Sequence, residues 1–335
     1  MKLIYAFCFC FLLNNCAITT QYPSKINGVS YVASRDSITE IHIKPLLNIH
    51  ANYASIMPFG FIRDLSHPII QYNSKRQWFG ETKAGVKHYI HALKTNGIHI
   101  MIKPQIWVWK GEFTGDITMK TEADWKAFEN SYTQFILDYA EVAQEIGADI
   151  FCIGTELEHF IEARPNYWKE LIKKIRQVYK GKLTYAANWN EYNQTPFWNK
   201  LDYIGIDAYF PVSDLKTPTV EACKLGLGRW KTEMKHTCDS LKKPVLFTEF
   251  GYRSVDFSGK KPWLTDRQMG TVNLQAQTNA TQAFFETFWN EDWIAGGFIW
   301  KWHHNHKTAG GNNNTRFTPQ NKPAEQVIKD FYSKK

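Results

Sequence analysis

The sequence predicts an α/β protein built as a single (β/α)8 TIM barrel, and three observations support this fold class. Eight short apolar runs alternate with helix-like segments over roughly 300 residues, as in a barrel of this kind. No glycine-rich phosphate-binding pattern follows the first run, which disfavours a doubly wound nucleotide-binding sheet. Polar and aromatic residues cluster directly after the runs, where such barrels carry their active sites.

The expected strands are short apolar runs that end at polar or aromatic residues. In chain order they cover residues 28–33, 51–58, 98–108, 148–153, 182–187, 201–209, 244–247 and 295–302. Residues 59–81, between the second strand and the next helix, are expected to form a long loop. Its length and its aromatic residues favour a functional role.

The expected helices lie between these strands and end at recognisable stop signals. They cover residues 37–47, 83–95, 122–146, 166–179, 220–241, 271–289 and 323–332. Asn96-Gly97 and Gly147 stand directly after the second and third of them, where glycine commonly terminates a helix.

Length and composition indicate one large domain over residues 28–335. The chain has 335 residues, of which 44% are hydrophobic, enough for a single barrel core. Aromatic residues make up 15%, with 13 tryptophans, more than such a core needs. Flat rings that line a groove for flat ligands, such as sugar rings, are a plausible use for the surplus.

The formal charge of +8 does not indicate a nucleic-acid partner. Lysine and arginine are spread along the expected helices, and the sequence has no basic run or nucleic-acid-binding signature. A solvated, lysine-rich surface explains the charge, and we expect a monomer.

Residues 1–16 have the composition of an export signal, with one lysine followed by an apolar run too short to span a membrane. The stretch LNNC ending at Cys16 resembles a bacterial lipobox, which predicts lipidation of Cys16; ordinary cleavage and release is the alternative. Residues 17–27 form a polar leader. We therefore expect a secreted, cell-surface or periplasmic protein whose contact with a membrane is through a lipid on Cys16.

Cysteine usage predicts neither a disulfide framework nor a metal site. After the signal the chain has only Cys152, Cys223 and Cys238, without metal-ligand spacing. Cys152 lies inside an apolar run and is expected to be a small core residue. No cofactor is expected.

Two expected strands end on a glutamate. The stretch KPVLFTEFGYR, residues 243–253, places Glu249 at the end of the seventh strand, and Glu156 follows the fourth strand in GTELE. If the strand count is right, the two carboxyl groups face each other across the barrel mouth. Glycoside hydrolysis requires such a pair, one to protonate the leaving oxygen and one to attack or to activate water.

These motifs resemble those of clan A glycoside hydrolases, whose members carry the acid/base after strand four and the nucleophile after strand seven. Within the clan, IGTELE, FTEFGY, the strand around Lys103-Pro104 and the strand FIWKW are most similar to glycoside hydrolase family 113, the barrel β-mannanases. The resemblance covers the chain from about Gly28 onward. It implies a retaining double displacement on β-1,4-mannan or manno-oligosaccharides, with Glu156 as acid/base and Glu249 as nucleophile.

Three alternatives remain open on the sequence alone. Within the clan, the enzyme could be an exo-acting β-mannosidase or a β-glucan or xylan hydrolase. From a different class, it could be a surface protein that binds glycans on an inactive barrel. The intact pair of glutamates argues against the inactive barrel.

One residue departs from the clan pattern. Most of the clan has asparagine before the acid/base, where it holds the sugar 2-hydroxyl, whereas this chain has Thr155. Threonine cannot span the reach of an amide, so Asn188 and Asn190 are the candidates to share that contact. Tyr209 is expected to donate a hydrogen bond to Glu249, because a nucleophile must be ionised.

Further candidates for sugar contacts lie at strand ends. Strand alternation predicts that Trp300 and Trp302 point the same way, with Trp300 at the floor of the subsite where the bond is cut; core packing is the alternative for all of the tryptophans. Asp207 is expected to orient its neighbours or to cap a turn. The remaining candidates are Trp107, Trp109 and Trp189, with Lys103, Arg63 and Asp64 as weaker ones.

Other charged residues near these motifs have simpler roles. His303, His304 and His306 lack a carboxylate partner in a metal-binding pattern, and we expect them to contact sugar hydroxyls from a loop. Glu158 and Glu162 are expected to be solvated charges after the fourth strand.

Overall fold

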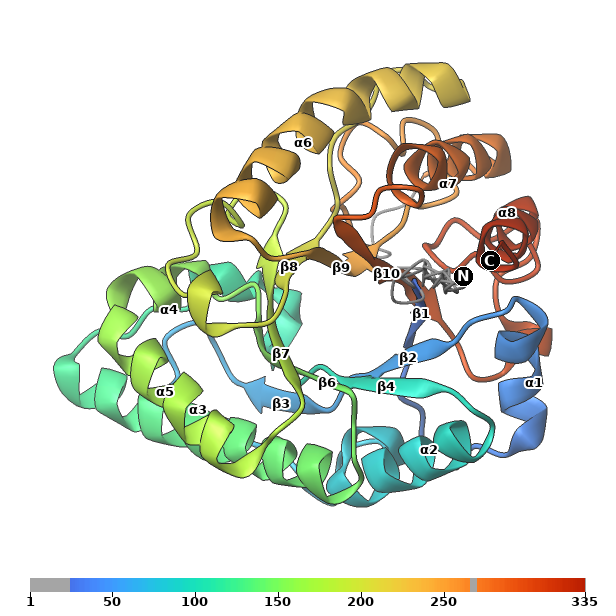
Figure 1. The fold of residues 1–335 in the computed structure, drawn as a ribbon. Helices are drawn as coiled ribbons and strands as arrows, with labels where there is room; N and C mark the ends of the chain where they lie inside the picture. Colours follow the sequence, from blue (N-terminus) through green and yellow to red (C-terminus); the bar gives the residue numbers. More distant parts are fainter. Residues whose placement is uncertain (1–24, 266–269, 335) are drawn as a thin grey trace, which may run out of the picture.

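The computed structural model describes residues 25–265 and 270–334, which form a closed barrel of eight parallel strands (Figure 1). The strands pair in the order β1, β10, β9, β8, β7, β6, β4, β2. They are β1 (Ile26–Tyr31), β2 (Tyr53–Ile56), β4 (His99–Ile102), β6 (Ile150–Thr155), β7 (Lys182–Asn188), β8 (Ile204–Asp207), β9 (Val245–Phe250) and β10 (Ile294–Trp302). The predicted (β/α)8 barrel is confirmed. The export signal, with Cys16, lies outside the described residues and stays a prediction.

Helices surround the strand barrel on its outside (Figure 1). They are α1 (Glu40–Asn48), α2 (Lys83–Thr95), α3 (Glu122–Glu145), α4 (Glu158–Ala163), α5 (Pro165–Val178), α6 (Val220–Leu241), α7 (Leu274–Phe288) and α8 (Pro323–Tyr332). Within the described ranges, none of these helices combines the length and the apolar character that crossing a membrane requires.

Side-chain caps explain where four helices begin. Thr82, Thr121 and Thr219 each accept a hydrogen bond from the backbone N–H three residues ahead, at the starts of α2, α3 and α6. Asn273 does the same for α7. Each such cap contributes about 1 kcal/mol to helix stability.

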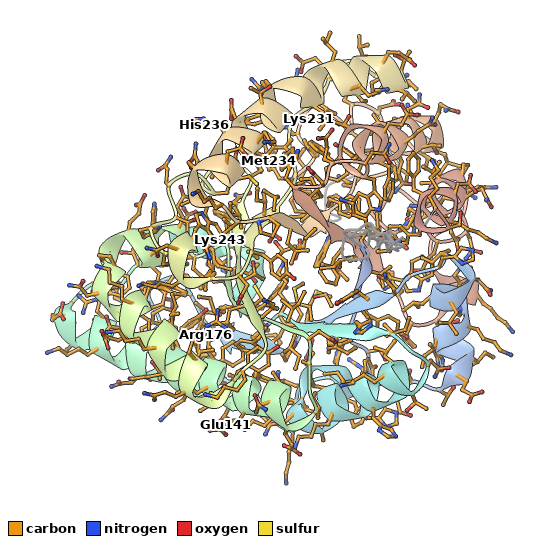
Figure 2. All side chains as sticks on the ribbon, in the orientation of Figure 1. Glu141, Arg176, Lys231, Met234, His236 and Lys243 are labelled. Carbon is orange, nitrogen blue, oxygen red and sulfur yellow. The ribbon has the colours of Figure 1, made fainter. Side chains whose placement is uncertain are left out.

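The barrel wall packs differently on its two sides. Its interior holds a small cluster that includes Cys152, Met101 and Phe298, which confirms Cys152 as a core residue. The larger cluster fills the layer between strands and helices. Helix α6 has one face in the layer between strands and helices and one face at the surface. Met234 is fully buried toward the barrel, whereas His236 is exposed on the outer face (Figure 2).

Two strands continue past the barrel. The predicted strand over residues 98–108 is interrupted at Lys103 and Pro104, since proline has no N–H to donate to a strand ladder. The chain then continues as β5 (Gln105–Val108), which pairs in parallel with β3 (Phe59–Ile62). The first residues of the predicted loop 59–81 are therefore a strand. Together β3 and β5 form a second, two-stranded sheet beyond the carboxyl ends of β2 and β4.

Candidate active site

The two predicted catalytic glutamates lie at the carboxyl ends of their strands. Glu249 is the penultimate residue of β9, and Glu156 follows the last residue of β6. On the strands between them, Asn188 of β7 is in register with Asp207 of β8, and Asp207 is in register with Glu249. Parallel barrel strands present these ends on one face, so the residues share the barrel mouth.

Three donors hold the carboxylate of Glu249, which is 6% exposed. Its Oε1 atom lies 2.5 Å from Nζ of Lys103 and 3.0 Å from Nε2 of Gln105. The hydroxyl of Tyr209 donates to Oε2 at 2.7 Å, the contact expected from the sequence. A buried carboxylate with a cation and two further donors is stabilised in its charged form.

Lys103 bridges Glu249 to a second buried carboxyl group. Its Nζ atom lies 3.0 and 3.1 Å from the two oxygens of Asp207, and the hydroxyl of Thr248 donates to Asp207 at 2.7 Å. Burial and the charge of Glu249 raise the pKa of Asp207 to about 7, although Lys103 and Thr248 oppose this. Burial alone would lower the pKa of Lys103, but Asp207 and Glu249 raise it overall. One cation therefore serves two carboxyl groups.

Glu156 has a different environment. Its side chain is half-buried and accepts no hydrogen bond from any residue in the described ranges 25–265 and 270–334. Burial raises its pKa well above the ordinary value, and the charges of Asp207 and Glu249 raise it further. The carboxyl group of Glu156 therefore retains its proton at a pH where an exposed glutamate would be ionised.

The backbone at Glu156 has a rare conformation. Its φ is +48°, in the left-handed region, and its N–H donates to the carbonyl of Ala186 at 2.9 Å. A non-glycine residue in this region costs about 1 to 3 kcal/mol, and the surrounding structure must supply that energy. The strand pairing also shifts between Cys152 and Thr155, where three residues of β6 oppose two of β7. A bulge of this kind changes the direction of the side chains after it.

A fourth carboxyl group, which was not predicted from the sequence, interacts with Glu156. Glu191 is 3% exposed, and its Oε1 atom accepts hydrogen bonds from the Tyr185 hydroxyl and the Asn188 N–H, both at 3.2 Å. Its Oε2 atom is buried and has no partner among the described residues. Burial raises the pKa of Glu191 to about 8, so this side chain is neutral at pH 7.

The raised pKa of Glu191 predicts a pH-dependent stability. The folded protein keeps this proton up to about pH 8, whereas an unfolded chain releases it near pH 4.5. The stabilising contribution is thus complete below pH 4.5 and is lost as the pH rises to about 8. Between pH 5 and 8 we expect the free energy of unfolding of the wild type to fall more steeply than that of Glu191→Gln, by on the order of a few kcal/mol.

Urea denaturation at a series of pH values measures this difference. Asp207 and Glu156 contribute in the same direction in both proteins, so the difference isolates Glu191. Glu162→Gln, which makes the same substitution at an exposed carboxyl group, should follow the wild type. Parallel pH profiles for the wild type and Glu191→Gln would contradict the raised pKa.

The tryptophans predicted to contact sugar differ in exposure. Trp107 and Trp109, on and just after β5, are 37% and 66% exposed. Trp189, after β7, is half-buried and stacks on Trp263, with ring centroids 5.0 Å apart and an interplanar angle of 21°. Trp263 comes from the segment after β9 and was not predicted. Trp300 is half-buried near the end of β10.

Trp302 corrects one prediction. It is fully buried and belongs to the layer between barrel and helices, together with Ile299. The pairing of β1 with β10 shifts between Val29 and Tyr31, so three residues of β10 oppose two of β1. This irregularity breaks the alternation, so Trp300 and Trp302 do not share an environment. Trp302 has no exposed surface with which to contact a sugar.

The polar candidates also differ in position. Lys103 is fully buried and pairs with two carboxylates, so its ammonium group is not exposed for a sugar contact. Asn190 is exposed, and Asn188 is half-buried with its Oδ1 atom accepting from the N–H of Trp189. The Oγ1 atom of Thr155 is buried and has no partner among the described residues.

The histidines after β10 have partners away from the two glutamates. His306 pairs with Glu325 at 2.6 Å, and the ring of His304 lies tilted against that of His42, with centroids 5.4 Å apart. In the described part of the chain, no group of three or more His, Cys, Asp or Glu side chains could hold a metal ion.

The charged residues outside the mouth lie at the surface. Glu158 and Glu162 lie on α4, half-buried and exposed respectively. Arg63 pairs with its neighbour Asp64 at 3.3 Å, and both are well exposed.

Comparison with known proteins places these features in a family. The model of glycoside hydrolase family 113 matches residues 32–322. No curated protein sequence matches the chain.

Solved structures share the fold at low sequence identity. The family 113 β-mannanase AaManA from Alicyclobacillus acidocaldarius, in complex with ManMIm, has a TM-score of 0.78 and 22% identity, over 93% of this chain and 98% of that one. A complex of a family 113 β-1,4-mannanase has a TM-score of 0.81 and 22% identity, over 93% of this chain and all of that one. A β-glucuronidase from Ruminococcus gnavus has a TM-score of 0.61 and 16% identity, over 93% of this chain and 50% of that one.

The family match covers most of the barrel and includes both strands that end on a catalytic candidate. It agrees with the resemblance noted in the motifs around Glu156 and Glu249. The chain belongs to glycoside hydrolase family 113 of clan A, and it is a glycoside hydrolase that acts on a polysaccharide or oligosaccharide.

Proposed function

We propose that this enzyme cleaves β-1,4-linked mannan or manno-oligosaccharides with retention of anomeric configuration. Glu249 acts as the nucleophile and Glu156 as the acid/base. The family match and the two β-1,4-mannanase and β-mannanase neighbours support the substrate class. The unequal environment of the two carboxyl groups supports the assignment of roles.

That unequal environment is the observation on which the proposal depends. Glu249 is fixed by Lys103, Gln105 and Tyr209, which stabilise negative charge, while Glu156 has a raised pKa and no donor among the described side chains. Two carboxyl groups of a glycosidase take different roles when their surroundings favour different protonation states. Here three donors, one of them a cation, contact the carboxylate of Glu249, and the neutral form is favoured at Glu156.

In the first step, a carboxylate oxygen of Glu249 forms a bond to the anomeric carbon while the glycosidic bond breaks. Glu156 transfers its proton to the leaving oxygen, so the leaving sugar departs as a neutral alcohol. The product of the step is a glycosyl ester on Glu249 and an ionised Glu156.

In the second step, water replaces the leaving sugar. Once Glu249 is an ester its charge is gone, and with it one of the causes that raise the pKa of Glu156. Glu156 can then accept a proton from the water, whose oxygen attacks the anomeric carbon and breaks the ester bond. Two displacements at one carbon restore its configuration, and both glutamates return to their starting states.

Residues around the mouth supply sugar contacts in this proposal. Trp300 is the candidate floor of the subsite where the bond is cut, and Trp107 and Trp109 offer exposed rings. Asn188 and Asn190 remain the candidates for hydroxyl contacts. The roles of Lys103 and Asp207 are to hold Glu249 rather than to bind sugar.

The substrate proposal is tested by incubating the enzyme with β-1,4-mannan, β-glucan and xylan and by measuring new reducing ends. We expect mannan to be cleaved at least about tenfold faster than the other two, since pocket contacts discriminate related substrates by this order. Proton NMR of the first product formed should show the β anomer.

The outcomes separate the alternatives. Preferred cleavage of glucan or xylan would contradict the substrate, and a first-formed α anomer would contradict the double displacement. Binding of glycans without cleavage would favour an inactive barrel. The sizes of the first products distinguish internal cleavage from release of single mannose units.

A further inference from the structure

We propose that Tyr185 and Glu191 are positioning residues for the acid/base, and that they act through the peptide that follows Glu156. Nothing in the motif resemblance assigns a role to either residue. The inference rests on the proposed function of Glu156, and the test below separates the failure of one from the failure of the other.

The contact that carries the inference is a hydrogen bond to the peptide N–H directly after Glu156. The N–H of Leu157 donates to the hydroxyl of Tyr185 at 2.7 Å, in the buried interior. On the other side, the N–H of Glu156 donates to the carbonyl of Ala186. Residues 185 and 186 of β7 therefore hold both peptide N–H groups that flank the side chain of Glu156.

Glu191 fixes the hydroxyl of Tyr185. Because this hydroxyl accepts from Leu157, its own proton is free to donate, and the Oε1 atom of Glu191 accepts it at 3.2 Å. The same Oε1 atom accepts from the N–H of Asn188 at the end of β7. The result is a chain of three contacts from β7 to the peptide after Glu156.

Glu156 needs such support because of its backbone. Its φ of +48° is a conformation that side chains other than glycine rarely adopt, and its carboxyl group has no hydrogen-bond partner among the described residues. The direction of the carboxyl group is therefore set from its backbone, by the hydrogen bonds on either side of its Cα atom.

The ring of Tyr185 is itself well fixed. It packs edge-on against Trp168 and Phe197, with ring centroids 5.9 and 5.6 Å away. A Cβ atom at Gly154 would lie only 3.2 Å from the ring, so β6 and Tyr185 are in close contact just before Glu156. The hydroxyl of Tyr185 consequently has little freedom to move away from Leu157.

The test uses substrates that differ in their need for an acid. We compare kcat/KM for 2,4-dinitrophenyl and phenyl β-mannobiosides, because dinitrophenolate departs without a proton whereas phenolate departs poorly without one. For Tyr185→Phe and Glu191→Ala we expect kcat/KM on the phenyl substrate to fall about 10- to 100-fold, a part of the usual contribution of a general acid. On the dinitrophenyl substrate it should stay within about threefold of the wild type, because that step needs no proton transfer.

A rescue variant and a matched control complete the comparison of the two substrates. Glu191→Gln keeps a carbonyl acceptor for Tyr185 and should restore the phenyl substrate to within about threefold of the wild type, as a repaired hydrogen bond requires. Tyr132→Phe is the matched control, since its hydroxyl is also buried and bonds to the neighbouring strand β6, but at the carbonyl of Ile153. It should not change the ratio of the two substrates.

The results that overturn the inference are specific. Equal losses on both substrates in Tyr185→Phe and Glu191→Ala, or no loss at all, would show a purely structural role. If Tyr185→Phe does not fold, the comparison of Glu191→Ala with Glu191→Gln still tests whether these residues support proton transfer by Glu156. A Glu156→Ala enzyme that still cleaves the phenyl substrate at the wild-type rate would instead contradict the proposed function itself.

Discussion

Glu249→Gln is expected to lower kcat on the cleaved polysaccharide by on the order of 10⁴- to 10⁶-fold, the loss typical of removing an enzymatic nucleophile. The amide is close in size to the carboxylate but cannot form the glycosyl ester. It also brings an N–H₂ group toward Lys103, Gln105 and Tyr209, which all donate hydrogen bonds to this position. Initial rates of reducing-end release measure the loss.

The control for this variant is Glu162→Gln on α4, an exposed carboxylate beyond the same barrel mouth. It should keep nearly the full rate. A second measurement identifies the nucleophile directly, because a 2-fluoro aryl β-mannoside should leave a stable sugar adduct on the peptide that contains Glu249. An adduct on another carboxylate, or substantial activity of Glu249→Gln, would remove Glu249 from its role.

Lys103→Met is expected to have the largest effect on stability. The substitution removes the one cation that Asp207 and Glu249 share, and it leaves two buried carboxyl groups facing each other. Removing one partner of a buried ion pair typically costs about 3 to 5 kcal/mol. Urea denaturation should show this loss, and the activity should fall as well because the nucleophile loses its strongest donor.

The comparison for Lys103→Met is Lys87→Met, which removes a surface pair with Glu145 and should change stability little. The double variant Lys103→Met, Asp207→Asn tests the explanation further. It removes one of the two facing carboxyl groups and should recover part of the lost stability. If Lys103→Met unfolds at the same urea concentration as the wild type, the buried cation does not stabilise this site.

The barrel and its two catalytic candidates could be predicted because each depends on local pattern. The apolar runs identify the strands, and the residue after a run is at the carboxyl end of the barrel wherever that strand lies. The positions of Glu156 and Glu249 at the barrel mouth follow from this pattern and from a count of strands. Their assignment did not require knowledge of which side chains touch.

The rest of the site depends on register, which the sequence does not display. Gln105 reaches Glu249 only because the chain resumes as a strand after Pro104. Tyr185 of β7 meets Leu157, which follows β6, and Glu191 contacts Tyr185; neither belongs to a recognisable motif. Trp302 was misplaced because an extra residue in β10 turns its side chain into the outer layer. Such irregularities have no reliable signature in residue type.

The short sheet of β3 and β5 has a consequence for how a substrate is placed. Gln105 and Trp107 are two residues apart on β5, so they lie on one face of the strand about 7 Å apart. Gln105 holds Glu249, whereas the side chain of Trp107 is 37% exposed. The backbone of β5 therefore fixes the spacing between the side chain that holds Glu249 and an exposed aromatic ring, and in the proposed mechanism a sugar resting on Trp107 lies at a set distance from the nucleophile.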